Sequence, residues 1–227
     1  MSKLWVFGDS FCQYNANWVK DLAGEDEVML FGKGGTSLLY TYKMLYNSVK
    51  DISADDRVLI GLTSVDRHMF RDWNLNGMID SKERDIAKWE KIDKAKGRDY
   101  SKHIRKDEEY AAAKGYFKYL HDHDDCTMLG NALMSHIINV VVPSLKTQRV
   151  AIVKTIGRDI DSTYNSDLNT NTLFDIAFNW LVNKGKCKQG DQQCAVSSMN
   201  TDNHWIDDEG YKEYFFNEIK QQLKLIR

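Results

Sequence analysis

Short apolar runs alternate with amphipathic segments along the first part of the chain. The apolar runs cover residues 4–7, 28–31 and 58–62. Between them, residues 11–22 and 38–49 repeat their large apolar side chains at spacings of three and four, as helices with one buried face do. Strands that are apolar throughout and alternate with helices are typical of a parallel sheet covered on both faces. The pattern therefore predicts a three-layer α/β/α fold with a mostly parallel sheet.

The alternation stops after the third apolar run. Residues 67–125 are rich in Lys, Asp and Glu, with a helical pattern at 106–120, and residues 127–142 form an apolar helical stretch. Because further alternating strands are missing there, we interpret about 67–147 as a helical insertion in a single domain that covers 1–227. Beyond it, the same patterns predict a strand at 150–153 and helices at 172–182 and 208–226.

The balance of charged residues bears on which partners the protein could bind. The 227 residues include 31 basic and 33 acidic side chains, which leaves a formal net charge of -2. We therefore expect no nucleic acid and no anionic membrane as a partner. No run approaches the roughly 20 apolar residues that span a bilayer, and the apolar N-terminal run is too short for a signal-peptide core. We expect cytoplasmic synthesis without a signal peptide, and assembly into a larger particle such as a virion stays open.

Small polar residues follow the first three apolar runs, where parallel sheets bind their ligands. These residues are Gly8-Asp9-Ser10, Gly34-Gly35-Thr36-Ser37 and Thr63-Ser64. Ser10 lies between a strand and the predicted helix, whose free N–H groups and positive end would stabilise an oxyanion together with the Gly35 N–H. The competing interpretation is that Asp9 or Ser10 only caps that helix.

A second candidate group lies near the end of the chain, in Thr201-Asp202-Asn203-His204-Trp205. A histidine just before a helix can act as the general base for a serine. A carboxylate close to it can orient the imidazole, so Asp202 and His204 together could activate Ser10. Taken alone, His204 would be read as an ordinary loop histidine.

The combination resembles the SGNH (GDSL-like) serine hydrolases. That family has Gly-Asp-Ser at the first strand end, a glycine after the second, and a late Asp-x-x-His followed by Gly-His/Tyr. The corresponding residues here are Gly8-Asp9-Ser10, Gly32 and Gly35, Asp202, His204 and Gly210-Tyr211. The resemblance implies a flavodoxin-like sheet and a Ser–His–Asp triad that hydrolyses esters, often acetyl groups on carbohydrates, without a cofactor. The Gly-x-Ser-x-Gly elbow of the α/β-hydrolases is absent from the sequence.

Two departures from the family pattern keep a second interpretation open. The family places an oxyanion Asn after the third strand, whereas this chain has Thr63 and Ser64 there. One of their hydroxyls would have to replace a donor whose loss costs about 100- to 1000-fold in rate. Asp202 also stands two, not three, residues before His204. The alternative is a non-catalytic SGNH-like binding or structural module of a larger assembly, such as a virus particle.

Other residues are interpreted more simply. Arg67 and Trp73 either line a sugar pocket at the same edge or belong to the packing of the insertion. The metal-capable run 121–126 is interpreted as a turn between helices, so we expect no metal. Residues 32–37 lack the spacing of a phosphate-binding loop. Cys187 and Cys194 either close a small disulfide loop or are reduced surface thiols, and Cys12 is assigned to packing.

Overall fold

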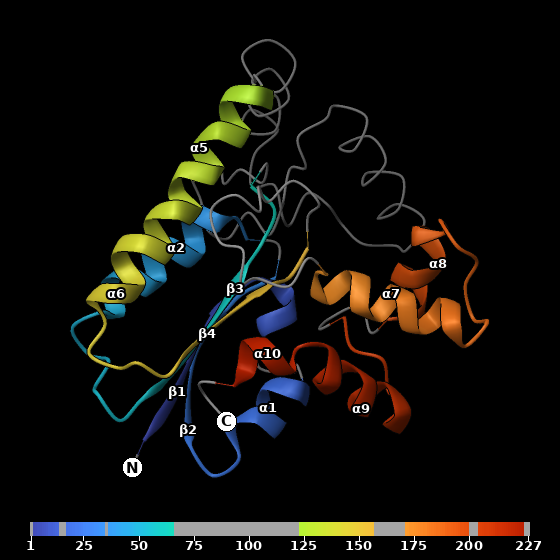
Figure 1. Ribbon diagram of the computed structural model, residues 1–227, viewed down its shortest axis with the longest axis horizontal. Coiled ribbons are helices and arrows are strands. Elements are labelled where there is room, and N and C mark those ends of the chain that lie inside the picture. The colour runs from blue at the N-terminus through green and yellow to red at the C-terminus, as the bar shows by residue number, and fades with distance from the viewer. Residues whose placement is uncertain are drawn as a thin grey trace, which may run out of the picture.

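The fold is a parallel sheet between two layers of helices, as the apolar pattern predicts (Figure 1). The computed structural model describes residues 2–13, 17–34, 36–65, 123–156, 171–199 and 204–224. Its sheet has the strand order β2-β1-β3-β4, and all neighbouring strands are parallel. The strands are β1 (Lys3–Gly8), β2 (Glu27–Gly32), β3 (Arg57–Leu62) and β4 (Val150–Lys154).

Each face of the sheet is covered by its own group of helices (Figure 1). On one side lie α2 (Leu38–Ser48), α5 (His123–His136), the π-helical segment Ile137–Val141 and α6 (Val142–Ser144). On the other lie α1 (Asn17–Ala23), α7 (Leu173–Asn183), α8 (Gln192–Ser198), α9 (Glu209–Glu218) and α10 (Lys220–Leu223). Alternate side chains of β1 enter opposite cores, because Leu4 and Val6 pack with α7 and α9 while Trp5 and Phe7 pack with α2. This double burial explains why the strands are apolar throughout.

Several predicted helices have different bounds in the structure. The helix predicted at 11–22 is wrong at its start: Ser10–Cys12 form a single 3-10 turn, and α1 begins only at Asn17. The C-terminal helix is interrupted at Ile219, where the backbone leaves helical geometry. The helix α8 was not predicted from the sequence. Residues 67–122, which hold most of the predicted insertion, lie outside the described residues.

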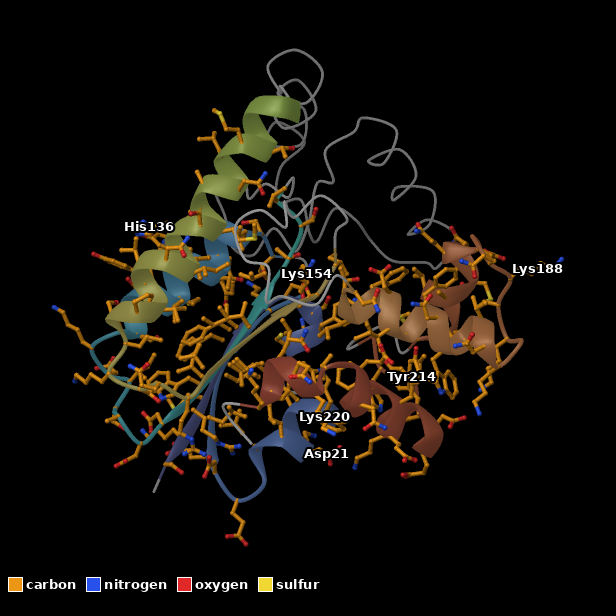
Figure 2. The ribbon with its side chains drawn as sticks, in the orientation of Figure 1. Asp21, His136, Lys154, Lys188, Tyr214 and Lys220 are labelled. Carbon is orange, nitrogen blue, oxygen red and sulfur yellow. A yellow bond between two sulfur atoms is a disulfide. The ribbon has the colours of Figure 1, made fainter. Side chains whose placement is uncertain are left out.

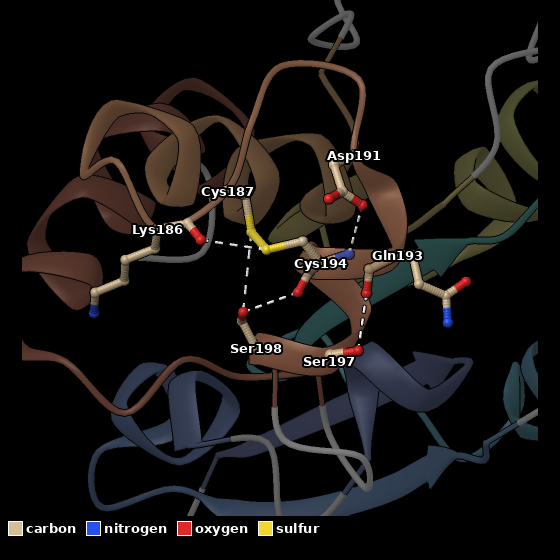
Figure 3. The surroundings of a disulfide bond; sticks show 7 residues. All are labelled: Lys186, Cys187, Asp191, Gln193, Cys194, Ser197 and Ser198. Carbon is tan, nitrogen blue, oxygen red and sulfur yellow. Dashed lines mark hydrogen bonds between the residues drawn. A yellow bond between two sulfur atoms is a disulfide. The ribbon is translucent and has the colours of Figure 1, made fainter.

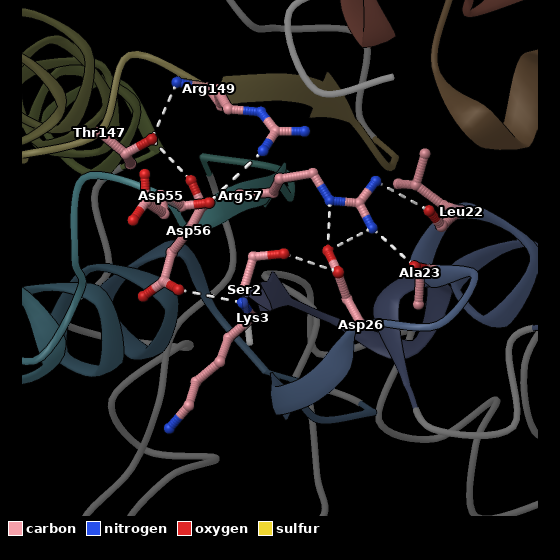
Figure 4. Close-up of polar contacts among 10 residues, drawn as sticks. All are labelled: Ser2, Lys3, Leu22, Ala23, Asp26, Asp55, Asp56, Arg57, Thr147 and Arg149. Atoms are coloured by element: carbon pink, nitrogen blue, oxygen red, sulfur yellow. Dashed lines mark hydrogen bonds and ion pairs between the residues drawn. The ribbon is translucent and has the colours of Figure 1, made fainter.

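Buried charges stabilise the edge of the sheet where β1 and β3 begin (Figure 4). The Asp56 carboxylate accepts hydrogen bonds from the Lys3 N–H (3.0 Å), the Trp5 indole (2.9 Å) and the Ser53 N–H (2.9 Å). Burial raises the pKa of Asp56, but these hydrogen bonds outweigh it and hold the pKa below its usual value. The edge therefore depends on an ionised carboxylate.

Arg57 connects the same edge to the end of α1. Its guanidinium pairs with Asp26 (2.7 Å) and donates to the last carbonyls of α1, at Leu22 (3.0 Å) and Ala23 (2.6 Å). Burial raises the pKa of Asp26, but hydrogen bonds from Ser2 and Arg57 and the Arg57 charge lower it further than burial raises it. The arginine thus satisfies helix carbonyls that would otherwise lack donors.

Cys187 and Cys194 form a disulfide, which decides between the two interpretations of these cysteines (Figure 3). Their Cα atoms are 5.8 Å apart, and the bond links the segment that follows α7 to α8. Asp191 caps α8 by accepting from the Cys194 N–H at 3.0 Å. Within the described residues, no helix is long and apolar enough to cross a membrane.

Candidate functional site

Ser10 lies in the tight turn immediately after β1. Asp9 caps this turn, because its Oδ1 accepts from the Phe11 N–H at 3.1 Å and its carbonyl accepts from the Cys12 N–H at 3.0 Å. The capping role considered for Ser10 or Asp9 therefore belongs to Asp9. The half-buried Ser10 hydroxyl makes no hydrogen bond to any described residue. The sequence predicted that the N-terminus of a helix over 11–22 would stabilise an oxyanion beside Ser10. This expectation does not apply, since the turn spans only Ser10–Cys12.

Three strand-end glycines make room for this turn. A Cβ on Gly61 would lie 2.5 Å from the Cys12 Sγ, and one on Gly8 would lie 2.8 Å from the same atom. A Cβ on Gly32 would collide with the Cys12 carbonyl. Gly8 also has φ +155, a region that side chains disfavour. The turn thus rests directly on the ends of β1, β2 and β3, and any added side chain there would displace it.

Cys12 packs among these glycines, as the sequence indicated. Its side chain is completely buried. Burial, reinforced by the nearby negative charge of Asp9, raises the pKa of its thiol well above the usual value. A neutral, inaccessible thiol is a packing group, so Ser10 is the nucleophile candidate in this turn.

Asp9 also connects the turn to the fourth strand. The carboxylate is fully buried, and its Oδ2 accepts from the Thr155 hydroxyl at 2.7 Å. Thr155 directly follows β4, on the far side of β3 from β1. The polar residue after the fourth apolar run was missed in the sequence, although it occupies the same kind of position as Thr63 and Ser64.

His204 approaches the turn from the opposite end of the chain. Its ring stacks on the Phe11 ring, with a centroid separation of 4.6 Å and an interplanar angle of 28°. Phe11 is the residue next to Ser10. The backbone of His204 has φ 54, and His204 is the one residue other than glycine in the described structure with positive φ. Such a conformation costs about 1 kcal/mol or more and persists only where the surroundings impose it.

An aromatic cluster holds the segment that carries His204. Trp205, the next residue, is buried and packs edge-on against Tyr211 (4.9 Å) and Phe215 (5.1 Å) of α9. Phe215 in turn contacts Trp18 of α1 at 5.3 Å. Because α1 and α9 lie together on one face (Figure 1), this cluster anchors the backbone directly after the histidine. The anchor for His204 therefore combines Trp205 and Tyr211, which the sequence analysis placed in its motifs, with apolar side chains of α1 and α9.

The loop after β2 also reaches the turn. A Cβ on Gly34 would lie 3.7 Å from the Ser10 Cβ, and the Lys33 N–H donates to the Gly8 carbonyl at 3.1 Å. At the end of β3, Thr63 is fully buried and Ser64 is nearly so. The structure thus brings the three predicted strand ends to one edge of the sheet. Gly35, Asp202, Arg67 and Trp73 lie outside the described residues.

Lys154, the last residue of β4, is a second residue that sequence reasoning missed (Figure 2). Its side chain is largely buried, and burial lowers the pKa of its amine, while the negative charge of Asp175 opposes that change. A buried amine at a strand end is unusual. Because Lys154 directly continues the apolar run 150–153, its burial could have been predicted from the sequence.

Elsewhere, a cavity of about 480 Å³ lies between α1 and the start of α9. It is lined largely by charged side chains, among them Asp21 and Lys212, which form an ion pair at 2.8 Å. Ser10 is not part of this cavity. Among the residues that the structure describes, no group of three or more His, Cys, Asp or Glu side chains is arranged to hold a metal ion.

Comparison of the chain with protein-family models, with curated proteins and with solved structures gives no match. Function therefore has to be argued from the residues around Ser10.

Proposed function

We propose that this protein is a serine esterase in which Ser10 is the nucleophile and His204 the general base. The observation that carries the proposal is the stacking of His204 on Phe11, next to Ser10, at 4.6 Å. Through Phe11, it links the chain next to Ser10 to His204, a residue near the other end of the chain. The absence of a capping bond to Ser10 among the described residues, and the positive φ of His204, support it further.

In the proposed reaction, Ser10 attacks the ester carbonyl while His204 accepts its proton. His204 then returns the proton to the leaving alcohol, which leaves an acyl ester on Ser10. Water, deprotonated by His204, attacks this ester, and the acid is released as Ser10 regains its proton. Asp202 orients the imidazole. The Ser10 and Gly35 N–H groups hold the oxyanion, with the Thr63 or Ser64 hydroxyl in place of the family's Asn. Stacking on Phe11 limits rotation of the His204 ring.

The proposed substrate is an O-acetylated carbohydrate. The choice of substrate rests on the resemblance to SGNH hydrolases and not on a particular side chain. The proposed enzyme needs no cofactor, because a serine, a histidine and a carboxylate supply all the groups that ester hydrolysis requires.

A second candidate is an SGNH-like module that binds a ligand or serves as a structural part of a larger assembly, such as a virus particle. The absence of an Asn after β3 favours it. The two candidates differ in one property: an esterase needs an activated serine, whereas a binding module does not.

The test is labelling with a fluorophosphonate, which reacts with activated serines. We expect the wild-type protein to be labelled and to hydrolyse p-nitrophenyl acetate, and Ser10→Ala to do neither. Ser197→Ala is the matched control, since Ser197 is exposed on α8 and its hydroxyl donates within that helix to the Gln193 carbonyl, so its loss should change neither labelling nor hydrolysis. Equal labelling of wild type and Ser10→Ala, or no labelling of either, would refute the esterase and favour the binding module.

The pH profile tests the base. With His204 as base, kcat/KM should rise through the range in which histidines titrate, roughly pH 5.5–7.5. His204→Gln should remove that rise together with most of the activity. A rise that persists in this variant would assign the base to another group.

A further inference from the structure

We infer that Thr155 is a positioning residue for the esterase reaction: its hydroxyl holds the Asp9 carboxylate and, through it, the turn that carries Ser10. The inference rests on the proposed function and adds a residue from the end of β4 that the triad and the oxyanion hole do not include. Thr155 would act without touching the substrate.

The Thr155 hydroxyl has two acceptors within reach but only one proton. The Asp9 Oδ2 lies at 2.7 Å and the Leu62 carbonyl at 3.2 Å. A carboxylate is the stronger acceptor, and the shorter distance agrees with a charge-assisted bond. The proton is therefore assigned to Asp9.

Thr155 itself is held firmly in place. It is fully buried. Its N–H donates to the Leu62 carbonyl at 2.8 Å, and its carbonyl accepts from the Phe174 N–H at 3.1 Å. These bonds fix it between β3 and α7, so the hydroxyl presented to Asp9 has a defined position.

Asp9 transmits that position to both candidate catalytic residues. Its other oxygen accepts from the Phe11 N–H at 3.1 Å. Phe11 directly follows Ser10 in the chain, and its ring stacks on the His204 ring. A shift of the Asp9 carboxylate would therefore move the nucleophile and the support of its base together.

Removal of the Thr155 hydroxyl should affect rate more than binding. The fully buried Asp9 carboxylate would lose a donor and would turn toward other donors. Displacements of about 1 Å in a catalytic group can cost about 100-fold in rate. Since the ester itself does not contact Thr155, its affinity should change little.

The chain offers a matched control in Thr147. This threonine is equally buried, and its hydroxyl donates to the Asp56 carbonyl at 2.6 Å and accepts from the Arg149 N–H at 3.0 Å (Figure 4). It precedes β4, whereas Thr155 comes directly after that strand. The two residues are separated by the length of β4, roughly 15–20 Å. Thr147→Val thus removes a buried, hydrogen-bonded threonine hydroxyl far from Ser10.

The experiment compares wild type with Thr155→Val, Thr155→Ser and Thr147→Val. For each, kcat and KM for p-nitrophenyl acetate, the rate of fluorophosphonate labelling and the thermal midpoint are measured. We expect Thr155→Val to lower kcat and the labelling rate by about 10- to 100-fold, with KM within about threefold of wild type. Thr155→Ser should retain at least about a third of kcat. Thr147→Val should lower the thermal midpoint about as much as Thr155→Val does, but its kcat should equal that of wild type.

Equal kcat values for Thr155→Val and Thr147→Val in an active enzyme would overturn the inference and leave the proposed function standing. So would a Thr155→Ser variant as slow as Thr155→Val. If Thr155→Val does not fold, Thr155→Ala and Thr155→Ser differ only in the hydroxyl and provide the same comparison. A wild-type protein that neither labels nor hydrolyses would refute the proposed function, and the inference with it.

Discussion

Substitution of Gly61 tests whether the Ser10 turn rests on the strand ends as described. In Gly61→Ala, the new methyl would lie 2.5 Å from the Cys12 Sγ and 2.9 Å from the Thr155 Cγ2. Comfortable contacts between such atoms are roughly 3.5–4 Å, so the methyl and the sulfur would overlap by about 1 Å or more. Overpacking of this kind costs about 1–3 kcal/mol. We expect Gly61→Ala to lower the free energy of unfolding by about 2 kcal/mol and to reduce esterase activity, because the turn must move.

Truncation of Cys12 should relieve this clash. Cys12→Ala alone removes one buried sulfur and should cost about 1 kcal/mol, comparable to the loss of a buried methyl. In the double variant the closest overlap disappears, although the Thr155 methyl still lies 2.9 Å away. The loss in free energy of unfolding of the double variant should therefore be about 1–2 kcal/mol smaller than the sum of the two single losses. It should also regain part of the activity that Gly61→Ala loses.

Gly32 provides the control for this cycle. A Cβ on Gly32 would collide with the Cys12 carbonyl, which belongs to the backbone. No truncation of the Cys12 side chain can relieve that collision, so Gly32→Ala and Cys12→Ala should combine additively. Urea unfolding of wild type, the three single variants and the two double variants gives the free energies by linear extrapolation. Losses for Gly61→Ala and Cys12→Ala that add within about 0.5 kcal/mol would refute the proposed packing of the turn.

Three further predictions concern the oxyanion hole and the charged groups of Asp26 and Lys154. One of Ser64→Ala and Thr63→Val should lower kcat by about 10- to 100-fold with KM little changed; if both keep wild-type kcat, neither hydroxyl is the third donor. The lowered pKa of Asp26 means that its contribution to stability is present above its unfolded pKa and is lost as pH falls through the folded value. Urea unfolding between about pH 6 and 3 should therefore show a weaker loss of stability for Asp26→Asn than for wild type, and identical pH dependences would contradict this. Burial lowers the pKa of Lys154, so the protonated amine opposes folding at neutral pH, and stability should rise as pH rises through the folded pKa. Lys154→Met should raise the thermal midpoint at about pH 7, whereas a lower midpoint would indicate that the charge is compensated.

Residues that are apolar on both faces of a strand were sufficient to predict the layers of this fold. A strand buried on both sides has no polar alternation, and this feature is visible in the sequence without any knowledge of neighbours. The strands accordingly begin and end close to the predicted positions; β3, predicted at 58–62, is Arg57–Leu62. Ser10 and His204 were also found from local signals, namely a serine at a strand end and a histidine before a helix. Their roles stay predictions.

Tertiary structure decided the course of the chain after β1. The sequence beyond Ser10 has the periodicity of a helix, yet Ser10–Cys12 form a 3-10 turn, because Cys12 has to fit among glycines from three different strands. Such contacts join residues far apart in the chain and leave no mark on local periodicity. The same holds for Thr155, whose hydroxyl meets Asp9 because β1 and β4 end at the same edge of the sheet with one strand, β3, between them. The sequence by itself determined the layers of the fold and the extent of its strands, whereas the strand order and the geometry around Ser10 depend on how separate strand ends fit together.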